Sequence, residues 1–304
     1  MSEAHVAAAQ LRDALTAIHE IKHHMAALGE RGDETHRSLH NTGQRVAELQ
    51  RRNLELNRRL DDILMLIRPG GLFAPPGVTL ETDSPVAAYS SDHQHPRGVA
   101  NDNTRHPRFV LASERALGGP LRVLDIGCAG GGLVIDFLKR GHTAIGLEGS
   151  DYALKQQVGS WPLIPHHLFT CDATKPFVLR HSQGPMRFDL VTAWEVMEHI
   201  PEPLLPGLLG NIREHLTSDG LFVASIATFP DADPETGVVW HVTIHDRAWW
   251  TARFAESGLE VVPSPYVTLD YPRGSGNAAM PVIDWNAEVS PAMGFHLAAR
   301  RRPT

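Results

Sequence analysis

Residues 123–132 read Val123-Leu124-Asp125-Ile126-Gly127-Cys128-Ala129-Gly130-Gly131-Gly132. A short apolar run ends in an acid, and a glycine-rich turn then leads into an amphipathic stretch over 133–139. This order predicts a strand, a tight loop and a helix, an arrangement that turns backbone N–H groups and a helix N-terminus toward a ligand. Glycine suits such a loop because a residue without Cβ permits unusual φ and ψ values and close backbone approach.

The loop does not match the nicotinamide-cofactor fingerprint Gly-x-Gly-x-x-Gly, because Ala129 occupies the second glycine position. It resembles instead the first motif of class I S-adenosylmethionine (SAM) methyltransferases. The resemblance covers nearly all of residues 105–300. It implies an α/β fold with the Rossmann-like, seven-stranded sheet of that class.

The pattern downstream of residue 121 agrees with this fold class, because predicted strands and helices alternate. We expect strands over 122–126, 143–147, 168–171, 188–193 and 221–226, with later candidates over 259–262 and 294–298. We expect helices over 109–117, 133–140, 153–158, 204–216 and 247–257. The alternation predicts a parallel sheet with helices on both faces.

Composition narrows the class of protein. The 304 residues suffice for one domain of about 200 residues with an appendage, and a formal charge of −7 argues against a dedicated nucleic-acid binder. We find neither an apolar run of about 18 residues nor a signal-peptide pattern, so we expect a cytoplasmic protein without a membrane partner. The two cysteines, Cys128 and Cys171, are expected to be reduced.

The N-terminal segment 1–68 is predicted to be helical, with a break near residues 29–32. Its second half repeats apolar residues at alternating spacings of three and four, from Leu39 to Ile67, with Asn53 at a core position. This heptad pattern predicts a coiled coil that forms a dimer; the alternative is a helix that packs back on its own domain. The arginines at 51–52 and 58–59 are interpreted as a solvated flank.

A polar segment separates this helix from the domain at 109–304. Pro69-Gly70-Gly71 ends the helix, and residues 81–108 are rich in His, Asp, Asn and Arg. Long irregular segments inside compact proteins are usually functional or disordered. We therefore expect 69–108 to be a linker and a lid over the active site.

The expected cofactor site lies at the carboxyl ends of the first strands, where open α/β sheets bind ligands. Asp125 and Glu148 end the first two strands and Asp172 follows the third. Glu148 suits the ribose hydroxyls, and the resemblance implies an acid near the adenine amino group at Asp172. Together with the glycine loop, these positions assign SAM binding to Asp125, Gly127, Cys128, Gly130, Glu148, Asp172, Ala173 and Trp194.

A second cluster of chemical groups follows the fourth strand, where residues 194–201 read Trp-Glu-Val-Met-Glu-His-Ile-Pro. Glu195, Glu198 and His199 can converge on a divalent cation, and mixed oxygen and nitrogen ligands suit Mg²⁺, Mn²⁺ or Fe²⁺. A further imidazole can come from His241 or His245. We expect Mg²⁺ or Mn²⁺.

The pattern Glu-x-x-Glu-His with a later histidine resembles two metal-dependent groups, the small-RNA 3′-terminal 2′-O-methyltransferases and the ubiquinone-pathway O-methyltransferases. The resemblance favours His241 over His245 as the later histidine, which gives the ligand set Glu195, Glu198, His199 and His241. The pattern also occurs in related enzymes without a known metal role, where the histidine bridges loops.

The chemistry that follows is methyl transfer to an oxygen. A cation lowers the pKa of a hydroxyl and orients it, and a general base removes the proton. His245, His93 and His95 are candidate bases, and the predicted catalytic residues are His245, His199 and Glu195.

Three functions compete for the acceptor side. The polar segment and the coiled-coil extension favour an O-methyltransferase acting on a sugar, glycan or other polyol. The metal motif also suits an RNA 2′-O-methyltransferase, against which stand the acidic charge and the lack of an aromatic stacking stretch. The third is a SAM-binding interaction module. The loop 266–285 is expected to be either an exposed hairpin or a cover that brings Tyr271, Arg273 and Asn277 to the substrate.

Overall fold

The computed structural model describes residues 71–274 and 286–302, together with five helical positions of the N-terminal segment (Arg45, Glu48, Arg52, Leu56 and Arg59). Most of the predicted coiled coil therefore lies outside the described residues, and the dimer stays a prediction. By its contacts, the chain divides into one unit at Met1–Leu56 and another at Asn57–Thr304. All that follows concerns the second unit.

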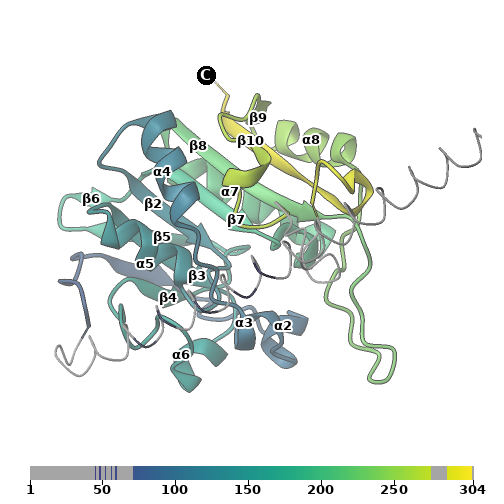
Figure 1. Ribbon diagram of the computed structural model, residues 1–304, viewed down its shortest axis with the longest axis horizontal. Coiled ribbons are helices and arrows are strands. Elements are labelled where there is room, and N and C mark those ends of the chain that lie inside the picture. Colours follow the sequence, from purple (N-terminus) through teal and green to yellow (C-terminus); the bar gives the residue numbers. More distant parts are fainter. Residues whose placement is uncertain are drawn as a thin grey trace, which may run out of the picture. The chain divides into compact units, whose positions relative to one another are not determined.

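The second unit contains a sheet of seven strands in the order β4-β3-β2-β7-β8-β10-β9 (Figure 1). Their bounds are β4 Leu168–Thr170, β3 Thr143–Glu148, β2 Arg122–Ile126, β7 Phe188–Trp194, β8 Leu216–Ala227, β10 Gly294–Arg301 and β9 Leu259–Val262. This confirms the predicted Rossmann-like, seven-stranded methyltransferase fold.

The sheet is mixed rather than wholly parallel, which corrects one prediction. β10 runs antiparallel to both neighbours, with Phe295 opposite Ile226 on β8 and Ala299 opposite Val261 on β9. The cause is connectivity: β10 follows β9 without a crossover helix, and a parallel neighbour would need such a crossover.

Helices cover both faces of the sheet (Figure 1). They are α4 Pro107–Leu117, α5 Gly132–Lys139, α6 Tyr152–Gln156, α7 Leu205–His215 and α8 Arg247–Glu256. Side chains of a strand alternate between faces, so Val123 packs in the core with α4 and α5 while Leu124 packs in the core with α7 and α8. The sheet is thereby buried on both sides, as the apolar strands predicted.

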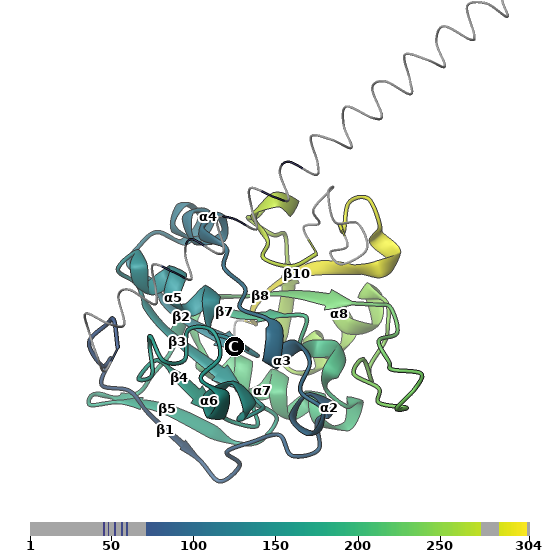
Figure 2. The same cartoon turned by 60° about the horizontal axis from the view of Figure 1, so that its bottom comes forward.

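The polar segment before α4 contains elements that the sequence did not reveal. β1 (Thr79–Thr82) pairs with β5 (Phe177–His181), and β6 (Gly184–Pro185) completes a small antiparallel sheet. Two short helices, α2 (Ser91–Gln94) and α3 (Gly98–Asn101), follow. α3 contacts α6, and Figure 2 shows both short helices near the carboxyl ends of the large sheet's parallel strands.

Short 3₁₀ turns complete the unit: η1 Met197–His199, η2 Glu202–Leu204, η3 Thr268–Asp270 and η4 Pro291–Met293. The first two lie between β7 and α7. Within the described residues, no helix is both long and apolar enough to cross a bilayer.

Candidate active site

A cavity of about 530 Å³ lies at the carboxyl ends of the parallel strands. Its wall includes Ile126 at the end of β2, Glu148 at the end of β3 and Trp194 at the end of β7. The segment 87–102 and the segment 229–241 supply the opposite wall. The polar segment thus borders the cavity, where a lid was expected.

Two backbone N–H groups hold the Glu148 carboxylate in place. Its Oε2 accepts from the N–H of Ala129 at 2.8 Å, and its Oε1 accepts from the N–H of Ser150 at 3.1 Å. Burial raises the pKa of Glu148 to about 7, although these N–H groups oppose the shift. Each oxygen retains a second lone pair, which suits a pair of ribose hydroxyls.

Asp172 and Ala173 line the cavity as predicted for the adenine end. Asp172 Oδ1 accepts from the N–H of Thr174 at 3.0 Å and from its hydroxyl at 2.6 Å. The hydroxyl of Tyr89 lies 3.5 Å from the same oxygen. Tyr89 was not predicted, since nothing in the sequence links position 89 to a strand end 83 residues later.

Asp125 lies behind the cavity wall rather than on it. Its side chain is buried and accepts from the hydroxyl of Thr192 at 2.6 Å, between adjacent strands. Burial, and secondarily the charge of Glu148, raise the pKa of Asp125 to about 7. Asp125 does not line the cavity. Its charge acts on neighbouring buried groups, such as the thiol of Cys128, whose pKa is raised by burial and by the charges of Glu148 and Asp125.

The glycine loop serves two surfaces. Gly127 and Ala129 face the cavity, whereas Cys128 and Gly130 are not on its wall. A Cβ on Gly130 would lie 2.6 Å from the carbonyl oxygen of Asp102, which itself accepts from the Gly130 N–H at 2.9 Å. Gly130 therefore allows the backbone at residues 102–104 to pack closely against the loop. The sequence had predicted a close approach to a ligand at this position instead.

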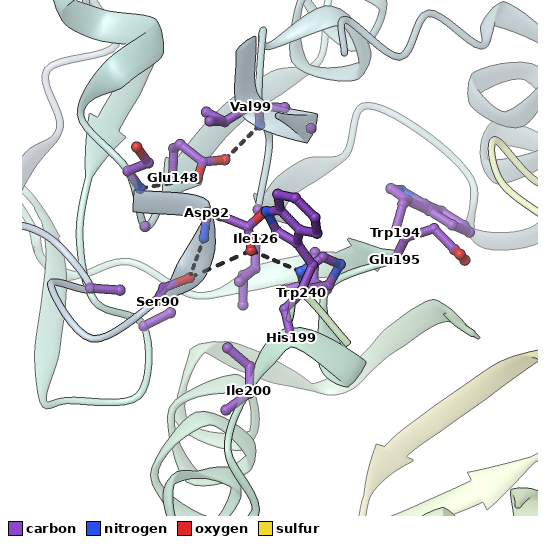
Figure 3. A pocket seen from close by; sticks show the side chains of 18 of the residues that line it. Ser90, Asp92, Val99, Ile126, Glu148, Trp194, Glu195, His199, Ile200 and Trp240 are labelled. Atoms are coloured by element: carbon purple, nitrogen blue, oxygen red, sulfur yellow. Dashed lines mark hydrogen bonds and ion pairs between the residues drawn. The ribbon is translucent and has the colours of Figure 1, made fainter. Parts of the chain in front are cut away.

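Trp194 and Glu195 both line the cavity. Glu195 has φ of 55°, the left-handed region that non-glycine residues seldom adopt and that is often found at functional sites. Figure 3 shows its carboxylate beside Trp194, pointing away from His199. The sequence did not predict this turn of the backbone.

The structure brings Glu198, His199 and His241 together, with one ligand atom of each within 4.8 Å of the others. Glu198 Oε1 accepts from the N–H of Ala227 at 3.0 Å, while its Oε2 is buried and has no hydrogen-bond partner among the described residues. The ring nitrogens have defined second partners: His199 Nδ1 lies 2.8 Å from Asp92 Oδ2, and His241 Nδ1 lies 2.7 Å from the carbonyl oxygen of Phe229.

These contacts suit a divalent cation. Metal-binding histidines usually donate their other ring N–H to a carboxylate or a backbone carbonyl, as both rings do here, which leaves Nε2 for the metal. An unpartnered buried carboxylate oxygen is costly unless something compensates it. Burial and the charge of Glu195 raise the pKa of Glu198 to about 8, so a nearby positive charge would be needed to keep it ionised at neutral pH.

The two histidines differ in their protonation. Burial lowers the pKa of His241 to about 4, so its ring is neutral at pH 7, as a ligand must be. Burial also lowers the pKa of His199, but the hydrogen bond and charge of Asp92, with the charges of Glu198 and Glu195, produce a net rise.

Two predicted residues are placed differently. Glu195 is not in the group whose ligand atoms lie within 4.8 Å of one another. His245 is outside the cavity wall: its Nε2 lies 2.6 Å from Glu202 Oε1 and its ring stacks on Trp249 at 3.9 Å between centroids. Because the ring of His245 does not line the cavity and is paired with Glu202, we assign it no chemical role.

The remaining candidate bases also lie off the wall. His93 and His95 are on or beside α2 but do not line the cavity, whereas their neighbour Asp92 does. Arg97 lines it too: it pairs with Asp231, and its guanidinium carbon lies 4.0 Å from the centre of the Trp240 ring. These contacts join segments that are distant in the sequence, so no local motif predicts them.

The loop before β10 contributes in part. Arg273 lines the cavity and pairs with Asp102, whereas Tyr271 is buried and stacks on His296 at 3.6 Å between ring centroids. Asn277 lies outside the described residues.

The comparisons with known proteins agree with this architecture. The family model described as a methyltransferase domain matches residues 92–264. The chain belongs to this family. It is a SAM-dependent methyltransferase of class I, and the matched region contains most of the residues that line the cavity, from Asp92 to His241.

Curated relatives match a shorter region. The ubiquinone biosynthesis O-methyltransferase of Aliivibrio fischeri is 31% identical over 103 residues, which are 32% of this chain and 40% of that protein. The protein of the same name from Pseudomonas fluorescens is 31% identical over 86 residues, 27% of this chain and 34% of its own length. The chain thus spans less than half the length of these relatives.

Solved structures are similar over a longer stretch but with low identity. The CcbJ methyltransferase from Streptomyces caelestis is 14% identical, with coverage of 70% of this chain and 96% of that chain and a TM-score of 0.45. The glycopeptide N-methyltransferase MtfA is 18% identical, with coverage of 64% and 90% and a TM-score of 0.42.

Proposed function

We propose that this methyltransferase transfers the methyl group of SAM to a hydroxyl oxygen with the assistance of a divalent cation, Mg²⁺ or Mn²⁺. The observation that carries the proposal is the buried, unpartnered Oε2 of Glu198 beside His199 and His241. The names of the curated relatives, which are O-methyltransferases, support transfer to oxygen.

Glu198, His199 and His241 would hold the cation, which when bound would lower the pKa of the acceptor hydroxyl and fix its orientation. The set inferred from the motif also contains Glu195, whose carboxylate is not grouped with the ligand atoms of these three residues. The charge of Glu195 nevertheless acts on Glu198 and His199. Glu195 lies on the cavity wall beside Trp194, with its carboxylate directed away from His199, and we assign it no proton-transfer role.

The cofactor's position follows from the first half of the cavity. Glu148 would accept from the ribose hydroxyls, Asp172 and Ala173 would border the adenine, and the turn at Gly127 and Ala129 would hold the methionine part. The sulfonium methyl would then face the region of Trp194 and Glu195. Holding donor and acceptor in this geometry supplies much of the rate enhancement.

We propose a small acceptor with neighbouring hydroxyls, such as a sugar, a glycan end or another polyol. Support comes from the polar groups on the acceptor side of the wall, Asp92, Arg97, Asn101 and Asp231, which offer donors and acceptors for several hydroxyls. Trp240 adds an apolar face beside them.

A second candidate is a phenolic acceptor with two adjacent hydroxyls. Apolar wall residues, Val196, Ile200 and Phe229, favour it, as does the name of the curated relatives. Both candidates share the same requirement for a chelating pair of oxygens.

The test is methyl transfer to a panel of polyols and catechols, measured as release of S-adenosylhomocysteine before and after dialysis against EDTA. We expect EDTA to lower the rate by about a thousandfold, as several kcal/mol of Lewis-acid stabilisation imply, and added Mn²⁺ to restore it. Unchanged transfer after EDTA would refute the metal, and transfer only to amines would refute the hydroxyl acceptor.

A further inference from the structure

The His199 ring is held by the segment that borders the cavity, not only by its own turn. Its Nδ1 lies 2.8 Å from Oδ2 of Asp92, which is 107 residues earlier in the chain and belongs to α2 (Figure 3). An ionised carboxylate only accepts hydrogen bonds, so the proton of the ring resides on Nδ1. Nε2 is then the ring nitrogen left for a cation, which would bind it in place of a second proton.

Asp92 is itself fixed by its neighbours. The hydroxyl oxygen of Ser90 accepts from the Asp92 N–H at 3.2 Å and begins α2 as its N-cap. The hydroxyl of Ser91 donates to the carbonyl oxygen of Val239 at 2.6 Å, which attaches α2 to the segment that carries His241. The Ala87 N–H donates to the carbonyl oxygen of Gly149 at 2.8 Å, beside Glu148. The segment that carries Asp92 is thereby attached both to the loop after β3 and to the segment that carries His241.

We propose that Asp92 is the positioning residue of the cation site: it fixes the tautomer and the orientation of His199. This inference rests on the proposed function, since it assigns His199 as a cation ligand. Asp92 is not in the group of ligand atoms within 4.8 Å of one another, so its action runs through the histidine.

The physical expectation is a loss of cation affinity without a loss of cofactor affinity. Removing the partner of a metal-binding histidine typically lowers metal affinity by about 10- to 100-fold. Asn at position 92 keeps an oxygen that can accept from Nδ1 but lacks the charge, so Asp92→Asn should lose less than Asp92→Ala.

The experiment is titration of the full chain with Mn²⁺ alone by calorimetry, for the wild type and for Asp92→Ala, Asp92→Asn, His199→Ala and Ser91→Ala. Ser91→Ala is the matched control, because it removes the neighbouring contact of α2 to Val239 and leaves the Asp92–His199 pair intact. S-adenosylhomocysteine affinity, measured in parallel, reports that each variant is folded. Long-range ¹H–¹⁵N correlation of the His199 ring reports the tautomer directly.

We expect Asp92→Ala to weaken Mn²⁺ binding by about 10- to 100-fold and to change the ring tautomer, with Ser91→Ala near the wild type. The inference is overturned if Asp92→Ala binds Mn²⁺ as the wild type does while His199→Ala does not. It is equally overturned if Ser91→Ala loses as much as Asp92→Ala, because the cause would then be the docking of α2. A wild type that binds no Mn²⁺ would refute the metal of the proposed function, and this inference with it.

Discussion

The two halves of the cavity are built from different kinds of structure. On the proposed cofactor side, Glu148 and Asp172 stand at or beside strand ends. Apart from the Tyr89 hydroxyl, the donors to their carboxylates come from the loop after β2 and from residues two positions further along the chain. On the acceptor side, Asp92, His199 and His241 come from three separate segments that carry little regular structure. The residues of the first half are therefore positioned by the strands of the sheet, whereas those of the second half are positioned by contacts between distant segments.

The strongest test of this division is Glu198→Ala. We expect methyl transfer to fall by about a thousandfold, because the variant removes a proposed cation ligand, while S-adenosylhomocysteine affinity stays within about threefold of the wild type. Rate assays and calorimetry on the same preparations measure the two quantities. Equal losses of rate and of cofactor affinity would show that the halves are not separable.

Glu148→Ala is the converse change. We expect cofactor affinity to fall by about 100-fold, since roughly 3 kcal/mol of hydrogen bonding to a charged group is lost, and Mn²⁺ affinity to be unchanged. Calorimetric titration with S-adenosylhomocysteine and with Mn²⁺ checks both. Unaltered cofactor affinity would remove Glu148 from the ribose site.

Gly130→Ala tests whether the glycine loop serves the border segment as well as the cofactor. The added Cβ would meet the Asp102 carbonyl oxygen at 2.6 Å, so we expect the free energy of unfolding to fall by about 1–3 kcal/mol. Gly210→Ala in α7 is the matched control, because its Cβ meets no atom within 4 Å, and alanine should stabilise that helix by about 0.5–1 kcal/mol. Urea denaturation compares them; a neutral Gly130→Ala would contradict the packing role.

The cofactor half should also depend on pH. Burial raises the pKa of Glu148 to about 7 in the protein without ligand, so below pH 7 its carboxyl is protonated and must lose a proton to accept hydrogen bonds from both ribose hydroxyls. SAM affinity should therefore rise by up to about tenfold from pH 6 to pH 8 and level off above. Calorimetry in buffers of different ionisation enthalpy counts the released protons, and Glu148→Gln should abolish this share of the dependence.

The smallest expected effect on the cavity is that of removing residues 1–56. Because both halves of the cavity belong to the unit at 57–304, we expect the rate of methyl transfer to change by less than about twofold. The mass in solution should fall from that of a dimer to that of a monomer if the heptad pattern forms a coiled coil. An unchanged oligomeric state would refute the predicted coiled coil.

Much of the fold was predictable because it rests on local patterns. The predicted strands at Arg122–Ile126 and Leu259–Val262 have the bounds found in the structure, and the helix starting at Arg247 follows the N-cap Asp246, whose side chain accepts from Trp249. Apolar runs and caps act through neighbours a few residues apart, so the sequence displays them. The antiparallel β10 and the small sheet of β1, β5 and β6 were missed, since strand direction and pairing are long-range properties.

The site divides in the same way. Glu148, Asp172 and the turn at Gly127 were found because the ends of parallel strands are readable from the strands themselves. Asp92, Tyr89 and Trp240 gave no signal, because each acquires its place through a contact across many residues of sequence: Tyr89 to Asp172, Asp92 to His199, and Trp240 to the carbonyl oxygen of His95.

The local sequence was enough to indicate a class I methyltransferase and to predict where the donor binds, because a strand, a glycine turn and an acid at the next strand end act together within a short stretch of chain. The arrangement of the proposed acceptor side depends on contacts between distant segments. These contacts leave Glu195 outside the group of Glu198, His199 and His241, pair His245 with Glu202 and bring Asp92 to His199. Buried polar groups form hydrogen bonds with whichever partners the packing of distant segments brings within reach. The spacing of residues along the chain does not predict these partners.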